Sequence, residues 1–373
     1  MSRIEELIKA HCKDGVEYKP LKDLAEVGTG TSNRNESADT GDFPFYVRSR
    51  TVYRADEFEF DEEAIIIPGE GGVGEIFHYV NGKYALHQRA YRICVKSPVL
   101  DTKFLLYFMQ SNFKKFILAK AVSATVTSIR KPMILDFETP IPPLEVQREI
   151  VRILDSFTAL EAELEAELEA RKKQYEFYRH QLLTFPEQGG VRWVPMGEVV
   201  LNLDSKRRPI TQSARSSGPY PYYGANGVQD YVEDFIFDDT LLLMGEDGSV
   251  IHKNGRPVLN WATGKMWVNN HAHVLAFKSD GINLRFLFHF LQTVDISSFV
   301  TGGAQPKLNK ANMNKILVPM IPSQDSAQIV DLLDQFDVLV NDISSGLPAE
   351  IAARRKQYEY YRDKLLTFPE AAA

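Results

Sequence analysis

Glycine-rich turns have the clearest spacing for chemistry in this chain, since successive backbone amides in such turns can bind phosphate. Residues 69–75 read GEGGVGE and residues 245–249 read GEDGS, and each follows a short apolar stretch. Neither ends in the Gly-Lys-Ser/Thr of a nucleotide-binding P-loop, and no helical pattern follows the first. We interpret both as turns in which a backbone can be approached closely, with contact to a partner as the functional alternative.

The histidines and clustered carboxylates offer no clear catalytic or metal site. His271 and His273 flank Ala272 and are expected on one face of a strand, but a zinc site would need further ligands and no cysteine lies near them. The acidic residues 61–63 and 238–239 precede apolar stretches and are interpreted as solvated turns. An Asn/Asp-Pro-Pro-Tyr/Phe stretch, which holds an adenine for methylation, does not occur. We predict no catalytic residue and no metal site.

The composition is that of an ordinary globular protein. Of 373 residues, 44% are hydrophobic and 25% are charged, and the net charge of −7 argues against a polycation that coats nucleic acid. Cys12 and Cys94 are the only cysteines, which fits a reducing compartment. Because no run of about 18 apolar residues and no secretory signal occur, we expect a cytoplasmic protein without membrane contact.

A long internal repeat organises the chain. Residues 170–187 (ARKKQYEFYRHQLLTFPE) and 353–370 (ARRKQYEYYRDKLLTFPE) are identical at fourteen of eighteen positions. Upstream, FPFY at Phe43 matches YPYY at Tyr220, and the two Gly-Glu turns occupy matching places. The sequence therefore predicts two variants of one globular module, each followed by a copy of the same helix.

The segment between the modules has a heptad pattern. Ile150, Phe157 and Leu164 lie seven apart, and Leu154 and Leu168 belong to the complementary row. Such a pattern predicts a coiled-coil helix of about 36 residues, or roughly 54 Å. The second copy begins in the same way but then meets SSGLP at residues 344–348, which predicts a break in that helix.

We predict an α+β fold for the modules. Strand signals at residues 64–68 and 240–244 alternate with turn residues, and helical stretches follow at residues 102–120 and 283–299. Two long antiparallel coiled-coil helices are expected to separate the modules, with a pseudo-twofold axis relating them. The predicted boundaries are residues 1–139 and 191–318 for the globular domains, and residues 140–190 and 319–373 for the long helices.

These features together resemble the specificity (S) subunit of type I restriction-modification enzymes. The resemblance covers nearly the whole chain and rests on PIPPLEVQREIVRILDSF with RKKQYEFYRHQLLTF, repeated as PMIPSQDSAQIVDLLDQF with RRKQYEYYRDKLLTF. It implies two target-recognition domains that read the halves of a split, asymmetric site in double-stranded DNA, and no catalysis by this chain. It also implies two methyltransferase (M) subunits docked on the helices, and restriction (R) subunits in the larger complex. S-adenosylmethionine, ATP and Mg are then expected on those partners, with no cofactor in this subunit.

The resemblance makes basic and polar loops of the modules candidates for DNA contact, because their side chains can reach phosphates and base edges. In the first module the candidates are Arg48, Arg50, Arg54, Thr125, Thr127, Ser128, Arg130 and Lys131. In the second they are Lys206, Arg207, Arg208, Tyr223, Asn226, Gln305, Lys307, Asn309 and Lys310. A basic, polar loop recurs at residues 125–131 and 305–310, and the alternative for each residue is a solvated surface charge.

Aromatic and apolar residues of the repeated helix are candidates for partner docking. Those of the first copy are Tyr175, Phe177, Tyr178, Leu182 and Phe185, and those of the second are Tyr358, Tyr360, Tyr361, Leu365 and Phe368. Some of them could simply close the coiled coil within the chain. Others fall off the heptad seam, so helices of a partner are expected to cover them.

The charge of the modules bears on how the chain would bind DNA. Residues 16–139 carry 16 Lys and Arg against 17 Asp and Glu, net −1, and residues 191–318 carry 13 against 11, net +2. Because nonspecific affinity depends on phosphate neutralisation, the isolated chain is expected to bind DNA weakly. The alternative reading is a non-DNA scaffold with two binding heads on a coiled-coil spacer, and a stand-alone enzyme is disfavoured by the missing motifs.

Overall fold

The computed structural model describes residues 3–33, 40–120, 128–186, 190–303 and 305–371. The chain forms two compact units, of which unit 1 comprises Met1–Glu165 with Ile351–Ala373 and unit 2 comprises Ala166–Glu350. The predicted helix after the first module is confirmed as α4 (Leu144–Leu183), whose first part belongs to unit 1 and the rest to unit 2. Among the described residues, no helix combines the length and the apolar character that crossing a membrane requires.

Unit 1 is built on one mixed sheet. Its described residues give six strands in the order β2-β7-β5-β6-β3-β4, in which β3 and β6 run parallel and the other neighbours antiparallel. On β5, Ile65 belongs to the core on one face of the sheet and Ile66 to the core on the other, which explains the uninterrupted apolar run. The strands are β2 (Ala25–Thr29), β3 (Phe43–Tyr46), β4 (Tyr53–Ala55), β5 (Phe60–Pro68), β6 (His78–Leu86) and β7 (Ala90–Val95).

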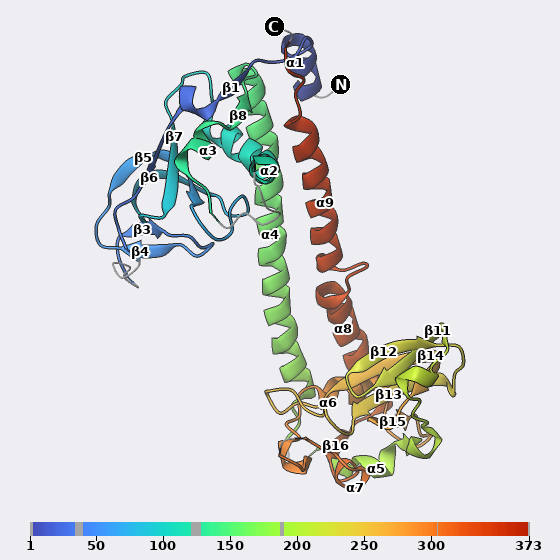
Figure 1. Cartoon of the computed structure of the whole chain (residues 1–373). Coiled ribbons are helices and arrows are strands. Elements are labelled where there is room, and N and C mark those ends of the chain that lie inside the picture. The colour runs from blue at the N-terminus through green and yellow to red at the C-terminus, as the bar shows by residue number, and fades with distance from the viewer. Residues whose placement is uncertain (1–2, 34–39, 121–127, 187–189, 304, 372–373) are drawn as a thin grey trace. The chain divides into compact units, whose positions relative to one another are not determined.

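Helix α2 (Thr102–Lys120) covers one face of this sheet and has the predicted bounds. Its Phe104 and Phe113 are fully buried and share one core with Ile65 of the sheet and Ile150 of α4. Figure 1 shows α2 between the sheet and the first part of α4. A short helix, α3 (Lys131–Leu135), and a two-stranded sheet of β1 (Tyr18–Pro20) and β8 (Glu138–Pro140) complete this side.

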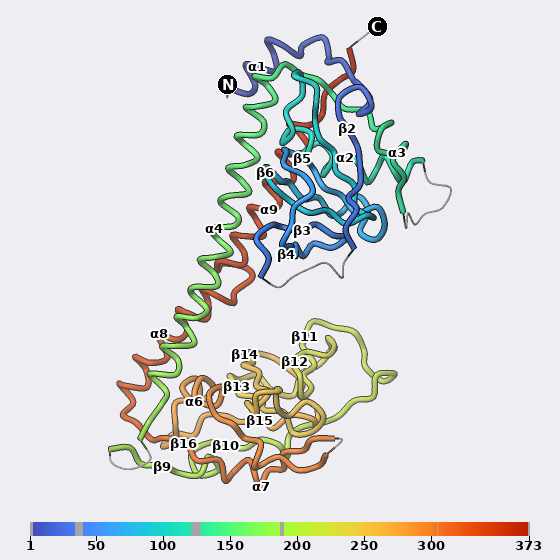
Figure 2. Tube along the Cα trace, turned by 90° about the vertical axis from the view of Figure 1, so that its left-hand side faces the viewer, coloured from blue at the N-terminus to red at the C-terminus, as the bar shows by residue number. Residues whose placement is uncertain are grey.

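The end of the chain is part of unit 1. After α9 (Leu347–Leu365), the Pro369 carbonyl accepts a hydrogen bond from the Val16 amide at 2.9 Å, and the Tyr18 hydroxyl donates to the Phe368 carbonyl at 2.9 Å. The first helix, α1 (Arg3–His11), precedes Val16, and Figure 2 shows the red segment after α9 beside the blue segment that follows α1. In unit 2 the Trp193 indole donates to the Pro186 carbonyl after α4, at 3.3 Å. Each repeat of LLTFP therefore lies against the start of a module.

Unit 2 repeats the topology of unit 1. Its described residues give six strands in the order β10-β15-β13-β14-β11-β12, which matches the order in unit 1 strand by strand, with β11 and β14 parallel. The predicted α+β fold and internal repeat are thereby confirmed. The strands are β10 (Leu201–Asn202), β11 (Ser217–Gly224), β12 (Gly227–Val232), β13 (Phe237–Gly245), β14 (Leu259–Val268) and β15 (Ala272–Ala276), and a small sheet pairs β9 (Arg192–Pro195) with β16 (Leu317–Met320).

The helix that covers the second sheet is shorter than predicted. Helix α6 runs over Leu284–Leu291, whereas the sequence predicted a helix over residues 283–299. The chain leaves the helix because the Asp295 carboxylate accepts the Ser297 amide at 2.8 Å and the Ile296 amide donates to the Gly255 carbonyl at 2.9 Å. Beyond α6, the short helices α5 (Met196–Val199) and α7 (Lys310–Met313) flank the sheet.

The predicted break in the second long helix is confirmed. Helix α8 (Ser323–Asn341) ends before Asp342, and α9 begins at Leu347. The Asp342 carboxylate accepts hydrogen bonds from the Ser344 amide at 2.7 Å and the Ser345 hydroxyl at 2.6 Å, which fixes the turn between the helices. Pro348 lies in the first turn of α9, where its missing amide hydrogen breaks no helical bond.

The long helices pair within each unit. In unit 1 the Phe157 ring of α4 stacks on Tyr361 of α9 at 5.7 Å, and Glu161, further along α4, pairs with Arg355, earlier in α9. This order of contacts is antiparallel, as predicted. In unit 2, Tyr175 of α4 stacks on Phe336 of α8 at 6.0 Å.

Candidate nucleic-acid interface

Each sheet carries one of the Gly-Glu turns at the end of an inner strand. In unit 1 the turn follows β5, and the Gly69 carbonyl accepts a hydrogen bond from the Ile129 amide at 2.8 Å. In unit 2 the turn follows β13, and the Glu246 carbonyl accepts one from the Leu308 amide at 2.8 Å. The turns therefore hold the loops around Ile129 and Leu308 at matching places, as the sequence comparison of these loops predicted.

In unit 1 the turn gathers basic side chains around Glu70. Its carboxylate accepts a hydrogen bond from Arg89 at 2.8 Å and pairs with Arg48. The hydrogen bond from Arg89 is the main reason that the pKa of Glu70 lies below its ordinary value. A pocket of about 250 Å³ beside Glu70 is lined by Arg89, Ser128 and Arg130, among others. Arg48, Ser128 and Arg130 of the predicted DNA contacts thus lie together at the end of β5.

The remaining candidates of the first module lie elsewhere. Arg54 donates to the carbonyls of Gly41 and Asp42, both at 2.7 Å, and so closes a turn. Arg50 lies on the loop after β3 and reaches the Glu75 carbonyl at 3.4 Å, and exposed Lys131 begins α3. Thr125 and Thr127 lie outside the described residues.

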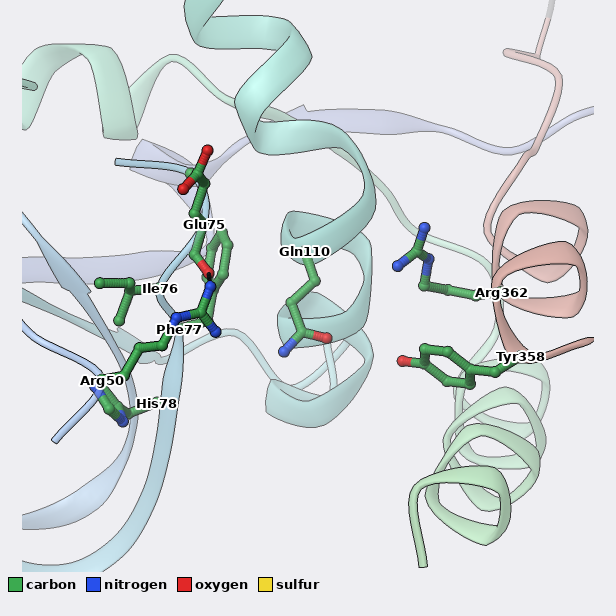
Figure 3. A pocket seen from close by; sticks show the side chains of 9 residues that line it. Arg50, Glu75, Ile76, Phe77, His78, Gln110, Tyr358 and Arg362 are labelled. Carbon is green, nitrogen blue, oxygen red and sulfur yellow. Dashed lines mark hydrogen bonds between the residues drawn. The ribbon is translucent and has the colours of Figure 1, made fainter. Parts of the chain in front are cut away.

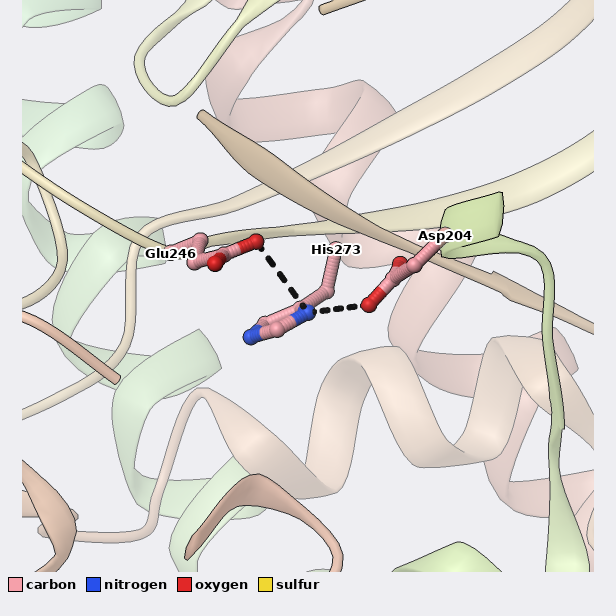
Figure 4. Close-up of side chains that lie close together, drawn as sticks. All are labelled: Asp204, Glu246 and His273. Atoms are coloured by element: carbon pink, nitrogen blue, oxygen red, sulfur yellow. Dashed lines mark hydrogen bonds and ion pairs between the residues drawn. The ribbon is translucent and has the colours of Figure 1, made fainter. Parts of the chain in front are cut away.

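In unit 2 the Gly-Glu turn is joined to a buried charged cluster. Figure 4 shows three of its members, Asp204, Glu246 and His273, and the fourth is Arg207. The Arg207 guanidinium bonds Glu246 at 2.6 Å and the Ala272 carbonyl at 2.7 Å, and the side chain is only 12% exposed. Arg207, predicted as a DNA contact, is therefore engaged within the module, where it positions the turn.

His273 connects this cluster to the recurring basic loop. Its ring nitrogens lie 2.7 Å from an Asp204 oxygen and 2.8 Å from the Leu308 carbonyl, and the side chain is 1% exposed. Because a carbonyl only accepts, Nε2 of His273 carries a proton and donates it to Leu308. His273 thereby fixes the backbone from which Lys307, Asn309 and Lys310 project.

Three members of the cluster have the residue types of a metal site. Ligand atoms of Asp204, Glu246 and His273 lie within 4.8 Å of one another. Burial works to raise the pKa of Asp204, but hydrogen bonds from His273 and from the Val274 amide outweigh it and hold the pKa below its ordinary value. The Arg207 guanidinium already pairs with both carboxylates, at 2.6 and 3.6 Å, so we interpret the cluster as an internal ion network.

The other candidates of the second module differ in exposure. Asn309 is a helix cap, since its side chain accepts the Asn312 amide at 2.9 Å. Tyr223 is half-buried on β11, and Asn226 is exposed in the turn between β11 and β12. The exposed basic and amide side chains of this set are Lys206, Arg208, Gln305, Lys307 and Lys310. None of these placements tests DNA contact, so the residues remain predictions.

The sequence did not predict the role of the turns before β7 and β15, which lie next to the Gly-Glu turns. Arg89 precedes β7 and bonds Glu70, while His271 precedes β15 and bonds Asp247. The expectation that His271 and His273 share one face of a strand is wrong, because His271 lies in the turn before β15 and only His273 lies in the strand. The signal was present as HQRA at residues 87–90 and NNHA at residues 269–272, which lie at matching places of the repeat.

The predicted docking residues fall into two sets. Six of them pack within their own unit and are buried or only partly exposed: Tyr175, Leu182, Phe185, Tyr358, Leu365 and Phe368. The other four are exposed: Phe177 at 59%, Tyr178 at 38%, Tyr360 at 62% and Tyr361 at 37%. Phe177 and Tyr178 of α4 lie at the same repeat positions as Tyr360 and Tyr361 of α9. The exposed pairs, here called the aromatic pairs, are the part of the prediction that a partner can reach.

Comparison with known proteins identifies the family. A family model described as the type I restriction modification DNA specificity domain matches residues 13–170 and again residues 193–353. The chain belongs to this family. The two matches cover the two copies of the repeat, so this specificity family accounts for most of the chain's length.

Curated relatives carry the same description. A putative type I restriction enzyme specificity subunit of Haemophilus influenzae is 40% identical over 188 residues, which is 49% of this chain and 48% of that protein. The EcoprrI specificity subunit of Escherichia coli is 32% identical over 305 residues, or 76% of this chain and 74% of that protein. The chain thus spans from about half to three quarters of the length of these relatives.

Solved structures share the fold. The crystal structure of a type I restriction-modification S subunit from M. genitalium aligns with a TM-score of 0.63 at 18% identity, over 94% of this chain and 96% of that one. A chain from a study of complex assembly in a type I system aligns with a TM-score of 0.58 at 15% identity, over 95% and 98% of the two chains. At these identities the likeness supports the specificity-subunit fold alone.

Proposed function

We propose that this chain is the subunit that chooses the DNA sequence in a type I restriction-modification complex. Each module reads one half of a bipartite, asymmetric site in double-stranded DNA. The observation that carries the proposal is the repeat of one sheet topology, with a basic loop held at the same inner strand end each time, in a chain whose two halves both match a DNA specificity domain. Two modules that are related but differ in sequence account for a DNA site that is asymmetric and has two parts.

The side chains around the turns fit both kinds of DNA contact. Exposed Lys and Arg at the loops, such as Arg130 and Lys307, suit phosphates. Amide and hydroxyl groups, such as those of Gln305 and Ser128, suit base edges in the grooves. Inward residues such as Arg207 and His273 hold the loops, so a different sequence there would change which groups face DNA.

Catalysis in this proposal belongs to partners. The chain acts as a non-catalytic recognition subunit in the cytoplasm, and two methyltransferase subunits with S-adenosylmethionine modify adenine N6. Restriction subunits with ATP and Mg join through them. Support for two identical partners comes from the aromatic pairs, which lie at the same repeat positions on α4 and α9.

The direct test is to sequence genomic DNA from cells that express the methyltransferase encoded next to this chain's gene, either with or without this chain. We expect N6-methyladenine in a split motif with a fixed gap, and only when the chain is present. Methylation that is the same without the chain would overturn the proposal for that partner. A stable complex without any sequence-dependent methylation would favour the scaffold with two binding heads.

A further inference from the structure

Each unit contains a pocket beside its copy of the repeated helix segment. In unit 1 the pocket measures about 440 Å³ and is lined by Gln110 of α2 and Arg362 of α9, and Figure 3 shows these two side chains on neighbouring helices. In unit 2 it measures about 410 Å³ and is lined by Gln292, next to the end of α6, and Arg179 of α4. The arginines occupy one position of the helix repeat, and the glutamines end the matching stretches FLLYFMQ and FLFHFLQ. The duplicated fold therefore forms the same pocket twice.

The two pockets also agree in chemistry. Among the described residues, each is lined by two arginines, one histidine, one carboxylate and one glutamine. These are Arg50, Arg362, His78, Glu75 and Gln110 in unit 1, and Arg179, Arg256, His252, Asp337 and Gln292 in unit 2. Guanidinium and amide groups of this kind bind carboxylates through parallel hydrogen bonds.

The second arginine comes from a different part of the module in each unit. Arg256 precedes the residues that lead into β14, and the matching residue before β6 is Glu75. Unit 1 instead provides Arg50 from the loop after β3, and Glu75 is paired with Lys114. In both pockets the lining arginines thus outnumber the one lining carboxylate, although different residues supply the second arginine. A requirement for an anionic occupant explains this agreement better than a shared ancestry of the residues.

The two arginines at the shared repeat position, Arg179 and Arg362, have internal partners that an occupant can replace. Arg179 bonds Gln292 at 3.0 Å and the carboxylate of Glu176 at 2.6 Å. Arg362 lies over the Tyr358 ring at 5.7 Å and bonds the Asp363 carboxylate at 3.0 Å. In both cases the guanidinium already holds a carboxylate, so the geometry suits exchange for a carboxylate from outside.

The pockets lie next to the aromatic pairs. Arg179 directly follows Tyr178, and Arg362 directly follows Tyr361. We propose that each pocket accepts one acidic side chain from one copy of the methyltransferase subunit that docks on the neighbouring aromatic pair. The inference rests on the proposed docking of that subunit. It adds a charged pocket that fixes the position at which each methyltransferase subunit binds its unit.

The test disables one pocket and counts partners. The variant Arg50→Ala/Arg362→Ala removes both guanidiniums from the unit 1 pocket, and both side chains are partly or fully exposed, so folding should be retained. The matched control, Lys356→Ala/Lys364→Ala, removes the same charge from exposed positions of α9. Native mass spectrometry without DNA would measure how many methyltransferase subunits bind each chain, and melting temperatures would check the fold.

We expect the wild type and the control to bind two methyltransferase subunits. The pocket variant should bind one tightly and the second about tenfold to a hundredfold more weakly, because a charge-assisted contact is lost. Two tightly bound subunits on the pocket variant, or an equal loss in the control, would overturn the inference and leave the docking proposal standing. Normal assembly with loss of DNA binding would overturn it in favour of a phosphate site. A wild type that binds no methyltransferase would instead contradict the proposed function.

Discussion

At the residue scale, both units have a hydrogen bond at the same place of the repeat, but different side chains make it. In unit 1 the Tyr107 hydroxyl donates to Asp155 at 2.6 Å. In unit 2 the matching groups are His289 and Asp334, whose Nε2 and Oδ1 atoms lie 2.7 Å apart. In each unit this hydrogen bond joins the helix on the sheet to a long helix. Because histidine takes the place of tyrosine in unit 2, only that unit has a group at this position whose ordinary pKa is near neutral.

This exchange predicts a difference in pH dependence. Burial holds the pKa of His289 below its ordinary value of 6.5, although Asp334 works to raise it and Arg285 adds to the lowering. The folded unit therefore keeps His289 neutral while the unfolded chain takes up a proton as the pH falls through about 6.5, so the free energy of unfolding falls with it. Substitution His289→Tyr should remove this part of the decline.

Urea denaturation between about pH 7.5 and pH 5.5 measures the effect. The exposed histidine variant His180→Tyr serves as the control and should keep the wild-type profile. Tyr107→His should introduce an added acid sensitivity into unit 1. Identical pH profiles for the wild type and His289→Tyr would show that His289 is not the titrating group.

Neighbouring arginines of the second module are predicted to differ in role. Arg207→Met should lower the free energy of unfolding by about 3 kcal/mol, since it leaves buried carboxylates without their cation. Arg208→Met should change it by no more than about 0.5 kcal/mol, because that side chain is exposed. Denaturation midpoints measure the stability of the two variants. DNA binding by the assembled complex should weaken for Arg208→Met although its stability is unchanged. Equal destabilisation by both changes would contradict the inward position of Arg207.

At the element scale, the seam between α4 and α9 secures the end of the chain to unit 1. The Phe157 ring lies 6.3 Å from Tyr358 and 5.7 Å from Tyr361. Phe157→Ala should weaken this local packing by about 2 kcal/mol, and amides of residues 351–365 should then exchange roughly thirtyfold faster. Phe177→Ala, on the same helix but 59% exposed, is the control. Hydrogen exchange that is unchanged by Phe157→Ala would argue against a stabilising seam.

Much of the element structure was accessible from the sequence. The heptad rows around Phe157, the apolar run of β5 and the glycine and proline near residue 346 are local signals, and each predicted the observed element or break. The end of α6 was not accessible, since it depends on the Ile296 amide bonding Gly255, about forty residues earlier in the chain. Pairing of Val16 with Pro369 is longer in range still.

The candidate site was accessible only in part, for the same reason. The repeat identified the basic loops around residues 128–131 and 305–310, because residue type and position recur there. It gave no way to tell Arg207 from Arg208, since burial of one guanidinium depends on Glu246 and Ala272 far along the chain. The heptad rows did separate the packed Tyr175, which lies seven residues after Leu168, from the exposed Phe177, which falls off the seam.

At the scale of the whole molecule, the near-neutral modules predict weak DNA binding by the isolated chain. Few phosphates can be neutralised by modules of net charge −1 and +2. The complex with the methyltransferase should bind its site about a hundredfold or more tightly than the chain alone, with a steeper salt dependence. Fluorescence anisotropy at several salt concentrations measures both. Tight, sequence-selective binding by the isolated chain would contradict the prediction that strong DNA binding requires the methyltransferase.

The central claim is that each module reads one half of a bipartite site. It is tested most directly by exchanging residues 16–139 for the same segment of another family member and sequencing the N6-methyladenine of the resulting cells. The account predicts a new sequence in one half of the motif, with the other half and the gap unchanged. A motif that stays the same, or one that changes in both halves, would contradict it.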